Sequence, residues 1–121
     1  MKRGKLGSDE REAAFLRDIV IEGGDIEDFT RGMSFATFVA NRMARKAVTK
    51  CLESIAEGSK NLSPALKARH PQIPWKQIAG FRDLSAHHYW EMDYSLVWDI
   101  VRGHLPRLLT VVRDELDKSM K

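Results

Sequence analysis

The amino-acid sequence predicts an all-α fold, an up-and-down bundle of four or five helices. The chain has 121 residues, which suits one domain built around one core. Apolar residues recur with a helical period in several separate segments, and no segment shows convincing alternation of period two. No stretch approaches the roughly 20 apolar residues that a membrane span needs.

Composition and charge narrow the class of protein. Apolar residues make up 43% and charged residues 31%, as in ordinary soluble domains. The net charge of +3 and the pI of about 9.2 favour a polyanionic partner without establishing one. We expect residues 1–7 to form a disordered basic tail and residues 8–121 to form a single domain. Because no apolar segment follows the basic start, we expect no secretory signal and a cytoplasmic protein.

The first helix is predicted from a serine cap at residue 8 to about residue 30. Gly23 and Gly24 lie inside it and either end it or are carried through it at about 1 kcal/mol each. We favour a continuous helix, because Ile26 and Phe29 keep the helical spacing of the inner face.

The second predicted helix, residues 34–62, has the clearest helical period. Its inner face is small and apolar and includes Ala40, Ala44, Val48, Cys51 and Ile55. Its opposite face carries Arg42, Arg45, Lys46 and Lys50. This basic face is either a solvated surface or a surface that tracks the phosphates of RNA. The lone cysteine cannot form an intramolecular disulfide and is interpreted as core.

Prolines and glycines mark the remaining elements. Pro74 is well placed to begin a helix that reaches about residue 89. A short joint follows, and a further helix is predicted to end at Gly103. Pro106 permits a new first turn, and an apolar stripe from Leu108 to Leu116 predicts the last helix.

The segment Arg-Asp-Leu-Ser-Ala-His-His-Tyr-Trp, residues 82–90, concentrates groups that handle a phosphate. Arg82 offers a bidentate fork to phosphate oxygens, and His87 can carry a proton near neutral pH. Asp83 shares a helical face with His87 and can hold its imidazole in one tautomer. Arg82 lies about 140° from His87 on an ideal helix. Either the helix bends, or two copies meet across a two-fold axis.

Structural roles compete with these interpretations. Arg82 suits a salt bridge, and His87 a hydrogen-bonded place in an interface. His88 suits a structural position, although it takes the role of His87 if the register differs by one. Tyr89 suits packing against Trp90. We expect no metal site and no cofactor, because the four histidines lack the spacing and the thiolates of a zinc site.

The motif resembles the Arg-x4-His-x-Tyr signature of the HepT family in the HEPN superfamily, matched here by Arg82, His87 and Tyr89. Further landmarks follow in the family's order over roughly residues 12–118: Leu16-Arg17-Asp18-Ile19, Ile55-Ala56-Glu57-Gly58, His70-Pro71-Gln72-Ile73-Pro74-Trp75 and Val97-Trp98-Asp99-Ile100. Many relatives have Asn after the motif arginine. The carboxylate of Asp83 either tunes His87 or repels RNA.

The resemblance implies a HEPN-like homodimer that cleaves RNA without a metal in a composite cleft, as the toxin of a toxin–antitoxin pair. Arg82 and His87 would be catalytic, with Asp83 and His88 supporting them. The partner would be a minimal nucleotidyltransferase antitoxin that attaches AMP to Tyr89. The alternative is a non-catalytic helical module that binds a nucleotide or a partner nucleotidyltransferase.

Overall fold

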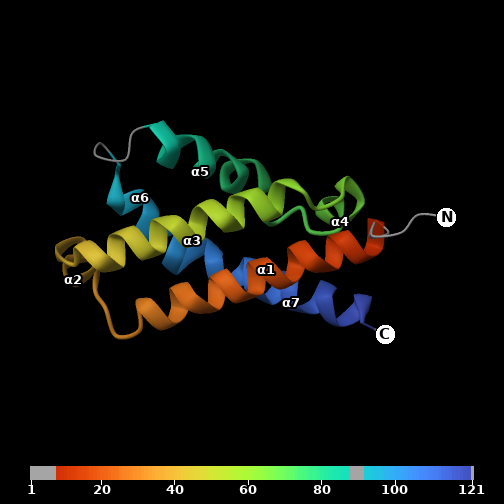
Figure 1. Cartoon of the computed structure of the whole chain (residues 1–121), viewed down its shortest axis with the longest axis horizontal. Coiled ribbons are helices and arrows are strands. Elements are labelled where there is room, and N and C mark those ends of the chain that lie inside the picture. The colour runs from red at the N-terminus through yellow and green to blue at the C-terminus, as the bar shows by residue number, and fades with distance from the viewer. Residues whose placement is uncertain (1–7, 88–91, 121) are drawn as a thin grey trace.

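The computed structural model describes the backbone of residues 8–87 and 92–120 and the side chains of residues 9–82 and 92–120. This part of the chain contains helices and no strand, which confirms the predicted all-α class (Figure 1). The central helix α3 (Arg42–Lys60) packs against both α1 (Ser8–Phe29) and α5 (Trp75–His87). The last helix, α7 (Leu105–Ser119), packs on α1. Among the described helices, none combines the length and the apolar character needed to span a bilayer.

Helix α1 runs without interruption through Gly23 and Gly24, as predicted. Ile19 and Ile26 are fully buried, whereas Phe29 is 43% exposed, so its predicted place on the inner face is wrong. Phe29 lies about 80° around the helix from Ile19, because ten residues at 100° each do not return to the same side.

The predicted helix over residues 34–62 is two helices, α2 (Phe35–Ala40) and α3. Ser34 caps α2, as expected, with a capping box formed with Thr37. Asn41 then adopts an extended backbone, and its side chain accepts a hydrogen bond from the Ala44 N–H at 2.9 Å. This N-cap makes a fresh helix start favourable. Ala40 consequently lies outside the core and is exposed, against expectation.

Residues 63–73, which separate the second and third predicted helices, contain the short helix α4 (Pro64–Ala68), which Ser63 caps. After α6 (Tyr94–Asp99), the predicted stop at Gly103 is wrong: a π-helical turn, η2 (Ile100–His104), leads directly into α7. Pro106 has no N–H and its ring would clash with a carbonyl in a regular α-helix. The wider π turn, closed by the Leu105 N–H on the carbonyl of Ile100, accommodates it.

The paired glycines of α1 provide a matched test of this packing. A Cβ built on Gly23 lies 2.4 Å from Cδ2 of the buried Leu109, whereas one on Gly24 meets nothing within 4 Å. We expect Gly24→Ala to raise the free energy of unfolding by about 0.5–1 kcal/mol through helix propensity. Gly23→Ala should lower it by about 1–3 kcal/mol through overpacking. Urea unfolding of both variants checks this, and equal shifts would contradict the described contact of α1 with α7.

Candidate functional site

Arg82 lies on α5, next to the buried Phe81, on a side that reaches α3. Its Nη1 lies 2.9 Å from Oε1 of Glu57, and both side chains are 49% exposed. An ion pair this exposed contributes only about 0–1 kcal/mol, because water screens both charges. The pair with Glu57 is therefore weak, and about half of the Arg82 side chain remains accessible to an anion from solvent.

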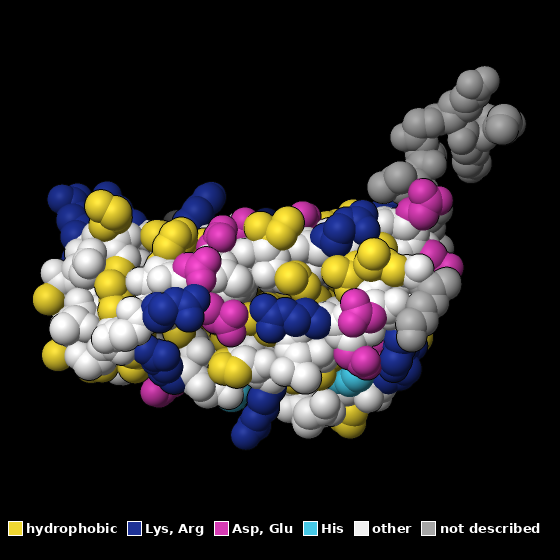
Figure 2. All heavy atoms as spheres, turned by 90° about the horizontal axis from the view of Figure 1, so that it is seen from below, with side chains coloured by type: hydrophobic (Ala, Val, Ile, Leu, Met, Phe, Trp, Pro, Cys, Tyr) yellow, Lys and Arg dark blue, Asp and Glu magenta, His cyan; other side chains and the backbone are white. Residues whose placement is uncertain are grey.

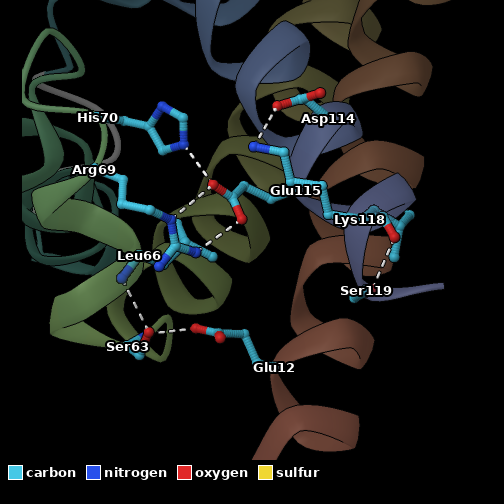
Figure 3. Close-up of polar contacts among 10 residues, drawn as sticks. Glu12, Ser63, Leu66, Arg69, His70, Asp114, Glu115, Lys118 and Ser119 are labelled. Atoms are coloured by element: carbon cyan, nitrogen blue, oxygen red, sulfur yellow. Dashed lines mark hydrogen bonds and ion pairs between the residues drawn. The ribbon is translucent and has the colours of Figure 1, made fainter. Parts of the chain in front are cut away.

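A polar cluster around the buried Glu115 of α7 lies beside the turn that leads into α5 (Figure 3). Glu115 of α7 is 5% exposed and accepts hydrogen bonds from Arg69 at 2.8 and 3.2 Å. The His70 ring nitrogen lies 2.6 Å from the same carboxylate. The indole N–H of Trp75 then donates to the carbonyls of Lys67 and His70. The cluster thus ties α7 to the turn before α5 and sets where α5 begins.

Sequence reasoning did not single out Glu57 or Glu115. Glu115 carried a usable signal, because it lies seven residues after Leu108 and three after Val112, on the apolar stripe of the last helix. A carboxylate at such a position is nearly always paired. Glu57 lay inside a recognised landmark, but nothing in its spacing indicated a contact with Arg82.

The other residues of the predicted site lie at or beyond the limit of the description. Asp83 and His87 lie on α5, where the structure describes their backbone but not their side chains. His88 and Tyr89 lie outside them altogether. The structure therefore gives the position of Arg82, and the functional assignments of all five residues stay predictions.

The predicted basic face of α3 is divided between two environments. Arg42, Lys46 and Lys50 are exposed. Arg45 is half-buried, lies over the ring of Tyr94 at 5.4 Å and donates to the Val39 carbonyl. On the face where α1 lies, basic and acidic side chains are interspersed (Figure 2). Three exposed cations on α3 therefore remain available to a polyanion.

One cluster of potential metal ligands was not expected. The ligand atoms of Glu22, Asp25 and Cys51 lie within 4.8 Å of one another, between α1 and α3. Burial, and then a hydrogen bond with Glu22, raises the pKa of the Cys51 thiol to about 12. The thiol is therefore protonated at neutral pH, and its buried position confirms the predicted core role. We assign no ligand to this cluster.

The helical bundle seen in the described residues defines an all-α, HEPN-like protein. The chain belongs to the ribonuclease HepT-like family, whose model matches residues 11–114. It is 43% identical over 93 residues to the "Putative RNase" of Methanocaldococcus jannaschii, covering 77% of each chain. It is 37% identical over 94 residues to the "Probable ribonuclease HepT" of Thermococcus cleftensis, covering 78% of this chain and 86% of that one. No solved structure matches this chain.

The Glu115 cluster predicts a specific response to acid. The hydrogen bonds from Arg69, opposed by burial, lower the pKa of Glu115 from 4.5 to about 2. Below pH 4.5 the unfolded chain binds this proton before the folded chain does, so stability present at higher pH is lost towards pH 2. The loss should be on the order of 3 kcal/mol.

Chemical denaturation between pH 6 and pH 2 measures this loss. Glu115→Gln should be less stable at pH 6 and should show a flatter dependence on pH. Glu27→Gln, which removes the carboxylate of an exposed pair with Arg113, is the matched control and should keep the wild-type slope. An unchanged slope in Glu115→Gln would contradict the described cluster.

Proposed function

We propose that this protein is a metal-independent endoribonuclease, the toxin of a HEPN toxin–antitoxin pair. The observation that carries the proposal is the half-exposed guanidinium of Arg82, on the motif helix of a ribonuclease HepT-like chain. The names of the relatives support the ribonuclease activity. The pairing with a nucleotidyltransferase antitoxin rests on the motif resemblance.

The proposed chemistry needs an anion-binding group and a proton carrier. Arg82 exchanges Glu57 for a phosphate oxygen of RNA and neutralises charge that develops on the phosphate. His87 removes the proton of the neighbouring 2′-hydroxyl, and the 2′-oxygen attacks phosphorus. The 5′-oxygen of the next nucleotide leaves with a proton, and a 2′,3′-cyclic phosphate remains. DNA has no 2′-hydroxyl and should resist.

A homodimer would supply the composite cleft. The C-terminal end of α5 lies towards the end of the bundle that carries α2 and α6 (Figure 1). Exposed apolar side chains gather on α2 and the start of α3 at this end: Phe35, Val39 and Met43. Exposed apolar clusters of this kind typically mark interaction surfaces. A two-fold contact here would bring two copies of the motif towards each other.

The catalytic assignment predicts cleavage of single-stranded RNA in EDTA, with cyclic phosphate ends. His87→Ala should reduce the rate about 10²–10⁴-fold, because it removes the proposed acid/base. Arg82→Ala should abolish most cleavage, whereas Arg107→Ala, which removes an exposed charge from α7, should leave it within about twofold of wild type. Loss of wild-type cleavage in EDTA with recovery in Mg²⁺ would contradict the metal-independent mechanism. A folded chain that binds a nucleotidyltransferase but cuts no RNA would favour the non-catalytic alternative.

The same assay tests the composite cleft. Mixing Arg82→Ala chains with His87→Ala chains should restore part of the activity, because one cleft of a mixed dimer then holds both groups. Light scattering should show at least a dimer. A fully active monomer would contradict this arrangement.

Regulation at Tyr89 is the second part of the proposal. On an ideal helix Tyr89 lies within about 20° of the direction of Arg82, so an AMP attached there would carry a phosphate towards the guanidinium. Incubation with the antitoxin and ATP should add one AMP to Tyr89 and silence cleavage, as mass spectrometry and the RNA assay together report. Tyr89→Phe should keep its cleavage and escape modification. AMP on Tyr89 with undiminished cleavage would refute the switch.

A further inference from the structure

A second candidate site lies beside α5. It is a cavity of about 420 Å³ between α5 and the α6–η2 segment, and we name it the α5–η2 pocket. Its apolar walls include Phe81, Leu96 and Ile100, and its polar residues are Gln77, Asp99 and His104. Sites for small ligands have this size and this composition, with apolar walls and a few polar groups that set orientation.

The polar residues of the pocket are not engaged in holding the helices together. Asp99 precedes η2 and His104 precedes α7, yet neither side chain caps the helix that follows it. Within the described part of the chain, neither makes an ion pair or a side-chain hydrogen bond. Both side chains can therefore form hydrogen bonds with a molecule that enters the pocket.

The π-helical turn shapes this wall. Ile100 and His104 are the first and last residues of η2, and both line the pocket. π turns are rare and occur frequently at functional sites, since regular helix would be more stable. Pro106 explains why a π turn forms here, and the pocket suggests a function for the turn.

The chemistry of the lining favours a nucleobase over a phosphate. Among the described residues that line the pocket there is no Lys or Arg, and the Asp99 carboxylate would repel an anion. A planar base fits between apolar walls, and its N–H groups match a carboxylate acceptor. Guanine suits Asp99 best, because two neighbouring N–H groups reach both carboxylate oxygens; uracil has a single N–H and no amino group.

We propose that the α5–η2 pocket binds a nucleobase of the RNA substrate, with preference for a base that carries an exocyclic amino group. The inference rests on the proposed ribonuclease function. Phe81 of the pocket directly precedes Arg82, and a helix with its side chains is only about 10 Å across. A strand whose phosphate meets Arg82 can therefore place a nearby base in the pocket and set where the enzyme cuts.

Binding is tested without any reliance on catalysis. Chemical-shift perturbation with GMP, AMP, CMP, UMP and ribose 5-phosphate should show signals around Asp99 and His104 responding to the three amino-bearing nucleotides. The affinity for GMP should exceed that for UMP about tenfold. Asp99→Asn should remove most of this difference. Responses that are absent, or that ribose 5-phosphate produces equally, would overturn the proposal.

Gly80 allows the pocket to be filled. It lines the pocket, and a Cβ there meets nothing within 4 Å, so Gly80→Leu should fold and block the base. Gly24→Leu on α1 is the matched control, because its Cβ position is also open. Gly80→Leu should lose GMP binding and flatten the base preference of the cut sites, and Gly24→Leu should retain both.

The outcomes separate the two proposals. GMP binding without any RNA cleavage refutes the ribonuclease but leaves the pocket intact. Cleavage with an unchanged base preference in both Gly80→Leu and Asp99→Asn refutes the pocket alone. Conversion of a dimer to monomers by Gly80→Leu would show that a second copy covers the pocket, which also overturns the inference.

Discussion

The carboxylate of Glu115 is buried between α7 and the turn that leads into α5, where Arg69 and His70 bind it. A buried charge without partners costs several kcal/mol. The turn that carries Arg69 and His70 therefore has to stay against α7 for the Glu115 carboxylate to be satisfied. The indole of Trp75 extends the same constraint into the first turn of α5. That cluster thus anchors the start of α5, and the packing of α5 on α3 sets the direction in which it continues towards Arg82.

The second constraint on the site is the close approach of α1 to α3. Gly58 is buried, and a Cβ placed on it would lie 3.0 Å from Cγ1 of Ile19. An alanine there would require the Ile19 side chain to shift by a few tenths of an ångström, so the two helices approach each other closely at this point. The preceding residue, Glu57, turns instead towards α5 and meets Arg82. The packing of α3 on α1 therefore helps to position Glu57, which pairs with Arg82 on α5.

Periodicity predicted most of the bundle, because long buried faces leave a signal in the sequence. The inner face of α3, including Val48, Cys51 and Ile55, is buried as predicted. The break at Asn41 and the π turn after Ile100 were missed, because each depends on one local hydrogen bond rather than on a repeating pattern. Arg82 could be singled out from its motif. Its pairing with Glu57 joins helices that are distant in sequence and could not.

An arginine proposed to bind RNA has to be accessible to a phosphate and also has to be held in position. The pair with Glu57 contributes little stability, so a phosphate with two oxygens for the guanidinium fork can replace it. Until then the carboxylate cancels the charge and weakens attraction to anions in general. The intermingled charges on the α1 face have the same effect over a wider area (Figure 2). With long-range attraction limited, discrimination among RNA sequences would have to come from short-range contacts, and in the proposed pocket Asp99 and His104 would provide them.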